Sequence, residues 1–280
     1  MFRAAAVSIV LFLLAGCSTS LTSFTPAQTT PGGHVRVSAA VGVNTGAGDM
    51  VDRIDEGSAR AEQFQTGQRT PTQMDAADFV DLAAALVVNP ATVGSDLQLR
   101  VGILDAWDFG VRVSNGTLRG DTRIQFLGRE ACDDVFFGSI GVGFGAYAFG
   151  FDVPVPGAYE DFVTLEDIER YEFDGSLLFG WSGSVGDVWF GPKVVYTTYS
   201  TTAKVALSPV PTVTAQITGS NIYYGGQVGL ALNLYIFRLA AELTIAGVSA
   251  SAEANSSGST SDQSTDGLVI YPAAGVMFEF

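Results

Sequence analysis

Few residues in this sequence could act as a base and a nucleophile. His34 is the only histidine, and the nearest serine on the same side of the predicted strand is Ser38. Four residues of extended chain separate them by about 13 Å at roughly 3.3 Å per residue, whereas a base and a nucleophile must come within about 3 Å. Cys132 is flanked by acids, which do not stabilise a thiolate. We therefore expect no catalytic residue and no enzymatic activity; a surface hydrolase is the least favoured function.

Carboxylates are the other groups that could do chemistry, as ligands for a divalent cation. Eight acids lie in residues 44–95 and six in residues 152–169. Oxygen ligands suit Ca²⁺ and Mg²⁺, but the ligand spacing of an EF-hand loop is absent. We expect a solvated acidic surface, with no metal site and no cofactor.

The chain begins with a segment typical of an export signal. Arg3 precedes an apolar stretch over residues 4–14, which is too short to span a bilayer. Residues 14–17 (Leu-Ala-Gly-Cys) resemble a bacterial lipobox. The resemblance implies that the signal peptide is residues 1–16 and that Cys17 receives lipid, palmitate included, from the lipoprotein-processing machinery. It also implies sorting to the outer membrane, and a plain signal peptide with a coincidental cysteine is the alternative.

Composition narrows the class of protein. The chain has 280 residues, of which 47% are hydrophobic and 15% charged, with a net charge of −15. Soluble domains carry about 25% charged residues, and an acidic chain is unsuited to bind nucleic acid. After the N-terminus no apolar run approaches the roughly 20 residues of a membrane helix. These observations favour a membrane protein built from strands.

Organisation along the chain supports one domain after a linker. Residues 17–33 are rich in Ser, Thr and Pro, and we expect them to form a flexible, lipidated tether. From residue 34 to residue 280, apolar residues recur at every second position in ten segments, a period typical of strands with one apolar face. The connections are mostly short at one end and long at the other, which is typical of outer-membrane barrels.

The sequence therefore predicts an all-β fold, a transmembrane antiparallel up-and-down β-barrel of about ten strands, with eight as the alternative. Strands of a soluble, lipid-anchored periplasmic β-domain also alternate apolar and polar residues, with the apolar face turned inward. Such a domain is a further alternative.

Aromatic residues favour the membrane interpretation. The three tryptophans lie beside predicted short turns, as in an interfacial belt: Trp107, Trp181 and Trp189. At the C-terminus, apolar residues stand at every second position and the last is aromatic: Val276, Phe278 and Phe280. This ending resembles the signal by which bacterial outer-membrane barrels engage their assembly machinery. With the repeated strands, residues 34–280 resemble the small porin-like and OmpA-like barrels of Gram-negative bacteria.

Charged residues on the predicted inner faces balance in sign. Barrels of about eight strands are filled by side chains, whereas aqueous pores need about sixteen strands. Because an unpaired buried charge costs several kcal/mol, we expect an ion-pair network that fills the lumen, with a narrow charged conduit as the alternative. Its predicted members are Arg36, Arg100, Asp108, Arg112, Arg123, Glu172, Asp174, Lys193, Arg238, Glu242 and Glu279.

Two predicted loops have distinct compositions. In the long loop 44–95, residues 72–88 have apolar residues at near-helical spacing, and Thr72 with Asp75 resembles a capping box. We expect a short helix there, at the barrel mouth. The last loop, 249–266, is rich in Ser, Gly and Thr, and we expect it to be mobile.

These observations predict an outer-membrane lipoprotein barrel with extracellular loops and a structural or surface-interaction role. A narrow channel or transporter for small solutes is the alternative function. We expect contacts with outer-membrane lipid, lipopolysaccharide and the barrel-assembly machinery, no nucleic-acid partner, and a monomeric state.

Overall fold

The computed structural model describes residues 19–45, 49–88, 92–128, 136–148, 161–256 and 259–280. Within these ranges the chain forms ten antiparallel strands and two helices. The shorter strands are β1 (Val35–Asn44), β2 (Thr92–Leu104), β3 (Trp107–Ser114), β4 (Thr117–Leu127) and β5 (Phe136–Tyr147). The longer strands are β6 (Val163–Ser182), β7 (Gly186–Val205), β8 (Val213–Leu234), β9 (Phe237–Ser256) and β10 (Ser259–Glu279). The helices α2 (Asp49–Gln65) and α3 (Gln73–Val88) lie between β1 and β2.

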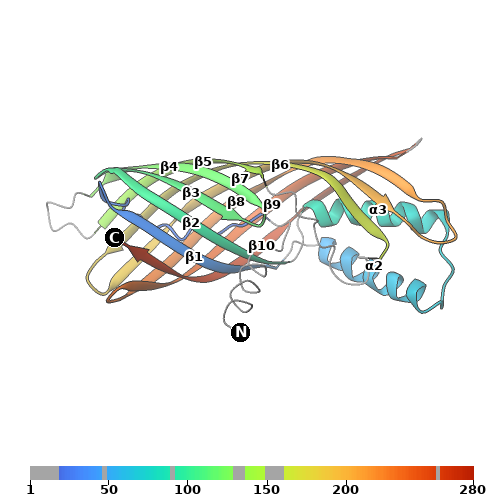
Figure 1. Cartoon of the computed structure of the whole chain (residues 1–280), viewed down its shortest axis with the longest axis horizontal. Coiled ribbons are helices and arrows are strands. Elements are labelled where there is room, and N and C mark those ends of the chain that lie inside the picture. Colours follow the sequence, from blue (N-terminus) through green and yellow to red (C-terminus); the bar gives the residue numbers. More distant parts are fainter. Residues whose placement is uncertain (1–18, 46–48, 89–91, 129–135, 149–160, 257–258) are drawn as a thin grey trace, which may run out of the picture.

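The ten strands close into a barrel in which neighbours in the chain are neighbours in the sheet (Figure 1). The ring is closed by β1 and β10, with Arg36 opposite Glu279. At the edge of this pair, Val35 and Phe280 exchange backbone hydrogen bonds of 3.0 and 2.9 Å. The predicted ten-stranded up-and-down barrel is confirmed, and the eight-stranded alternative is wrong.

The polarity of the outer and inner faces of the barrel wall reverses along the length of the strands, as β8 shows. Its outward side chains are apolar at Ile222 and Leu230, and polar at Gln216. Its inward side chains change in the opposite sense, from Gln227 to Ile217. β7 and β9 change in the same way, and the outward face of β10 also changes from apolar to polar. The wall therefore has a membrane band, apolar outside and polar inside, and an extension whose apolar face turns inward as in water.

The extension is formed by the longer strands. β6 to β10 have 20 to 22 residues, whereas β1 to β5 have 8 to 13. At about 3.3 Å per residue, the difference corresponds to roughly 30 Å. The mobile loop expected over 249–266 is wrong, because much of this range pairs β9 with β10, with Ser251 opposite Ser264. Alanines on the inward face of β9 give this polar sequence a side that can be buried.

α3 packs against the inward face of the extension, and α2 packs against α3 (Figure 1). Phe79 of α3 lies in one apolar core with Ile217 of β8. Its ring centroid is 5.9 Å from that of Phe64 and 6.1 Å from that of Phe162. The helix predicted over 72–88 is confirmed as α3, but α2, which is more polar, was not predicted. No helix among the described residues combines the length and apolar character needed to cross a membrane.

The tryptophans divide between the two faces of the wall. Trp107 and Trp181 lie on the outer face of the membrane band and are half-exposed. Trp189 is fully buried in the lumen, on the same face of β7 as Lys193. Its assignment to the outer belt is wrong, because it has the inward phase of its strand and its indole Nε1 donates a hydrogen bond to Glu242 at 3.1 Å.

Candidate functional site in the barrel lumen

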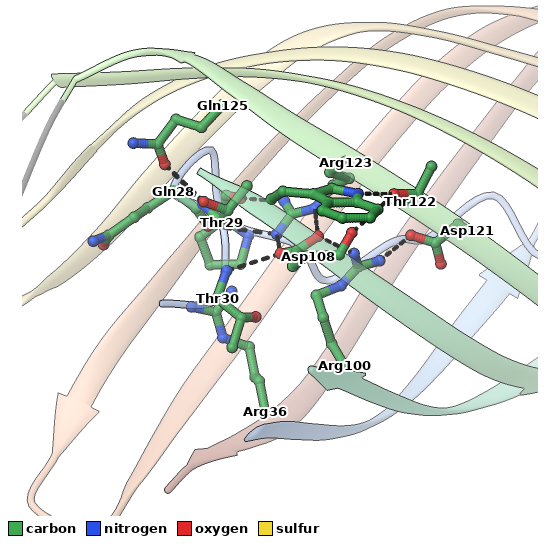
Figure 2. Close-up of polar contacts among 12 residues, drawn as sticks. Gln28, Thr29, Thr30, Arg36, Arg100, Asp108, Asp121, Thr122, Arg123 and Gln125 are labelled. Carbon is green, nitrogen blue, oxygen red and sulfur yellow. Dashed lines mark hydrogen bonds and ion pairs between the residues drawn. The ribbon is translucent and has the colours of Figure 1, made fainter. Parts of the chain in front are cut away.

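The inner wall near the start of β1 is organised around one carboxylate. Asp108 of β3 accepts hydrogen bonds from Arg100 of β2 and from Arg123 of β4, each at 2.5 Å (Figure 2). Arg100 also pairs with Asp121 of β4. Arg123 is opposite Asp108 in the register of β3 and β4. Since side chains opposite each other on one face lie close together, the register brings these alternating charges into contact.

Further ion pairs follow the wall around the lumen. They include Arg36–Glu279 at 2.6 Å, Arg112–Asp96 at 3.6 Å, Arg170–Glu172 at 2.7 Å, Arg238–Asp187 at 2.9 Å, and Arg119–Asp174. All the predicted lumen residues lie on the inward face, Arg238 and Glu279 being partly exposed at its rim.

Five charged lumen residues were missed by the sequence analysis. They are Asp96, Arg119, Asp121, Arg170 and Asp187. Arg119 and Asp121 precede Arg123 by four and two residues and share its face. The alternation of inward and outward residues continues through β4 to Arg119, but Gly120 interrupts the apolar outer face and weakens the pattern at this end of the strand.

The lumen also holds residues 19–31, which we call the lumen segment. It has no strand assignment, and its apolar side chains Leu21 and Phe24 are 1% and 2% exposed. The flexible tether expected over 17–33 is therefore wrong for these residues, while residues 17 and 18 lie outside the described part of the chain. A Ser- and Thr-rich chain can be buried here because its polar groups bind the charges of the wall.

The first half of the lumen segment binds wall charges through its backbone. The carboxylate of Glu242 accepts hydrogen bonds from the amides of Ser23 at 2.8 Å and Phe24 at 3.1 Å. The Lys193 ammonium donates to the carbonyl of Leu21 at 2.6 Å. Cations thus bind carbonyl oxygens and an anion binds N–H groups, so an uncharged segment satisfies charges of both signs.

The second half makes contacts of the same kind with the Asp108 group. Arg123 donates to the carbonyl of Pro26 at 2.6 Å, and the amide of Thr30 donates to Asp108 at 2.8 Å. Figure 2 shows Thr29 and Thr30 beside these charged side chains. The amide of Thr29 donates to Gln125 of β4 at 3.0 Å. The lumen segment is therefore part of the ion-pair network.

The lumen segment runs from the helix-bearing end of the lumen to the opposite end. At its start, the Ser20 hydroxyl donates to Asp96 at 2.6 Å and Arg170 binds the Thr19 hydroxyl. Arg170 is adjacent to Tyr171, where the pairing of β6 with the shorter strand β5 ends. The start of the lumen segment therefore lies at the ends of the shorter strands. Its other end leads directly into β1.

A small cavity adjoins the lumen segment. The cavity, of about 20 Å³, lies between Ser23, Thr25, Arg112, Arg119 and Asp174, among other residues. This is room for about one water molecule. The Nε and Nη1 atoms of Arg119 have no hydrogen-bond partner among the described residues.

The remaining candidate residues lie elsewhere. His34 is exposed and Ser38 is buried in the lumen. Cys17 and Cys132 fall outside the described residues. In the part of the chain that the structure describes, no group of three or more His, Cys, Asp or Glu side chains could hold a metal ion.

The C-terminal residues are on the outer face of β10. Val276, Phe278 and Phe280 share the phase of the exposed Ile270. The rings of Phe278 and Phe280 are stacked, with centroids 6.5 Å apart. The ending thus presents an apolar stripe toward the surroundings of the barrel.

No family model and no curated protein matches this sequence. Among solved structures, it is similar to a major outer-membrane protein from Thermus thermophilus, at 12% identity over 88% of this chain and 99% of that chain, with a TM-score of 0.35. It is also similar to Ail, the attachment invasion locus protein of Yersinia pestis, at 8% identity over 89% and 99% of the two chains, with a TM-score of 0.31. A third is the translocator domain of the autotransporter NalP from Neisseria meningitidis, at 9% identity over 100% and 95%, with a TM-score of 0.29.

The chain has the outer-membrane β-barrel fold. The assignment rests on its own geometry, namely ten strands in a closed ring, an apolar outer band and a charged interior.

Proposed function

We propose that this chain is a closed outer-membrane barrel with a structural or surface-interaction role, and that it is not a solute channel. The observation that carries the proposal is the lumen segment, which lies within the barrel and binds wall charges along its length. A channel needs a continuous aqueous path, and barrels near this size are filled by protein atoms.

In this proposal the helix-bearing end faces the exterior of the cell. At the opposite end, the links from β2 to β3, from β6 to β7 and from β8 to β9 have two or three residues. Short turns are typical of the periplasmic side of outer-membrane barrels. The extension and its two helices would then project beyond the membrane.

The proposed outer surface is acidic. Glu56, Glu62, Asp78, Glu169 and Glu253 are all exposed on the helices or the extension. We propose outer-membrane lipid and lipopolysaccharide as its surroundings and partners.

We also propose that Cys17 carries a lipid. The residues that carry this proposal are 14–17, which resemble a lipobox at the end of the apolar N-terminal stretch. Mass spectrometry of the mature N-terminal peptide tests this: an acylated Cys17 is expected, and an unmodified cysteine would contradict it.

Gel mobility of the outer-membrane fraction tests the embedded barrel. We expect the wild type and the Cys17→Ala variant to run faster unboiled than boiled, because folded barrels resist detergent, and both to stay in the membrane. Absence of the shift, with release of the variant into the periplasm, would contradict the proposal. In planar bilayers we expect the wild type to remain closed, and steady conductance would favour the channel alternative.

A further inference from the structure

Two charges on the inner wall of the membrane band differ from the others there. Among the described residues, the Lys193 ammonium and the Glu242 carboxylate have no opposite charge within 4 Å, whereas the arginines and the other acids form ion pairs. Both side chains are buried, at 6% and 3% exposed. Buried charges persist only where other groups satisfy them.

The partners of both charges are backbone groups of the lumen segment. Lys193 binds the Leu21 carbonyl, and Glu242 binds the amides of Ser23 and Phe24. Every peptide has such carbonyl and amide groups, whatever its side chains. These two side chains therefore recognise an extended peptide backbone. The hydroxyls of Thr22 and Ser23 add side-chain contacts to Glu242 at 3.0 and 3.4 Å.

The wall holds these recognition groups in place. The indole Nε1 of Trp189 donates to Glu242 at 3.1 Å, and the hydroxyl of Thr244 donates to the Leu21 carbonyl at 3.3 Å. Phe24 adopts a φ of 42°, a left-handed conformation that costs a non-glycine residue energy and persists where its surroundings enforce it. The site therefore enforces at Phe24 a backbone conformation that residues other than glycine rarely adopt.

The hydrogen-bonded ring of strands does not include the lumen segment. Each strand pairs with its two neighbours around the ring, and residues 19–31 belong to none of these ladders. Side chains of the wall hold the segment in the lumen, and the chain continues from the segment into β1. Its place in the lumen is therefore that of a ligand that is covalently attached at one end.

We propose that the lumen is a binding site for an extended, hydroxyl-rich peptide, with Lys193 and Glu242 as the groups that recognise its backbone. The chain's own residues 19–31 occupy this site, and a separate peptide can replace them when they are removed. The inference rests on the proposed function, a barrel that does not conduct solutes. It adds that the lumen is blocked because residues 19–31, or a peptide that replaces them, fill it.

The test uses a variant that lacks residues 19–31, with its folding checked by gel mobility before and after boiling. We expect its conductance in planar bilayers to exceed that of the wild type at least tenfold. A synthetic peptide of residues 19–33 should abolish this conductance in a saturable way. The matched control is the same peptide with N-methyl groups on the amides of Ser23 and Phe24, which should need at least tenfold higher concentration for half block.

The outcomes separate this inference from the proposed function. A conducting wild type overturns the closed barrel itself. A folded deletion variant that stays closed overturns the inference alone, and equal block by both peptides overturns backbone recognition by Glu242.

If the deletion variant does not fold, the full chain provides a second test. Lys193→Met with Glu242→Gln should produce transient openings in planar bilayers that the wild type lacks. The control replaces an exposed ion pair of the extension, with Glu166→Gln and Lys204→Met, and should remain closed. If the two double variants behave alike, the inference is wrong.

Discussion

The carbonyl oxygen of Pro31 occupies the place that a side chain at Gly102 would need. A Cβ atom added at Gly102 would lie 1.8 Å from this oxygen. Next to this contact, the amide of Gly33 donates to the carbonyl of Gly102, and the amide of Gly102 donates to the carbonyl of His34, each at 3.0 Å. Gly102 thus allows the lumen segment to leave the barrel interior and enter β1.

We expect Gly102→Ala to displace Pro31 and to destabilise the folded barrel by about 1–3 kcal/mol, as overpacked interiors do. Gly226→Ala is the matched control, because the nearest atom to an added Cβ there is 3.8 Å away. The midpoint of urea unfolding in detergent measures the difference. Equal midpoints for the two variants would contradict the close approach.

Asp108 is a second point where one residue supports the lumen. Asp108→Ala leaves the buried guanidinium groups of Arg100 and Arg123 without this carboxylate, and we expect a loss of about 3–5 kcal/mol of unfolding free energy. Glu166→Ala removes an ion pair with Lys204 whose side chains are 42% and 44% exposed, and should cost at most about 1 kcal/mol. The same urea titration compares them, and similar losses would argue against a structural role for the Asp108 group.

The boundary between membrane band and extension predicts different responses along β8. Leu230→Arg places a charge on the apolar outer face, and we expect it to cost about 2–4 kcal/mol in a bilayer. Gln216→Arg, on the polar outer face of the same strand, should cost close to nothing. The folded fraction in lipid vesicles, measured by gel mobility, tests this. Equal yields would place the boundary elsewhere.

The cap of α3 predicts a pH dependence outside the membrane. The amide of Thr72 donates to Asp75 at 2.8 Å, and that of Asp75 donates to the Thr72 hydroxyl at 3.3 Å. Burial disfavours the charged carboxylate, but hydrogen bonds from Thr72 and the charge of Arg69 outweigh it and lower the pKa of Asp75 below its ordinary value of 3.8. The stabilisation is therefore complete above pH 3.8 and is lost as the pH falls through the lowered pKa.

Hydrogen exchange of the α3 amides measures this effect. At neutral pH we expect Asp75→Asn to destabilise the helix by about 1 kcal/mol, a typical value for a lost cap. The variant should also lose the acid sensitivity of exchange that the wild type shows. Asp78→Asn, at an exposed position of the same helix, is the control. An unchanged acid response in Asp75→Asn would assign the sensitivity to another group.

The strands of the membrane band were predictable because lipid and lumen impose opposite demands on successive residues. The extension was harder to predict. Its inward residues, such as Ala250 and Ala252, are small and alternate with serines, so the composition matches that of a loop. Their burial depends on α3, which lies more than a hundred residues earlier in the chain.

The charged residues of the lumen were predictable from the alternation of inward and outward residues along each strand. The segment that fills the lumen was not. Residues 19–31 have the composition of a linker, and nothing local distinguishes a solvated linker from a buried one. The partners that bury them, such as Glu242 at 218 to 220 positions from the segment, are remote in sequence. Only the closed ring brings them together.

A disulfide between the lumen segment and the wall would show that the segment lies in the lumen of the folded protein. In a background with Cys17→Ala and Cys132→Ser, we would combine Ser20→Cys with Asp96→Cys, since the Ser20 hydroxyl lies 2.6 Å from the Asp96 carboxylate. The control pairs Ser20→Cys with Ser95→Cys, because Ser95 is adjacent in β2 and has the opposite strand phase.

A filled lumen predicts that mild oxidation of folded protein in membranes links residues 20 and 96, seen as a mobility change on a denaturing gel that reducing agent reverses, and leaves the control unlinked. A folded barrel in which the first pair remains unlinked, or in which both pairs link equally, would contradict the account.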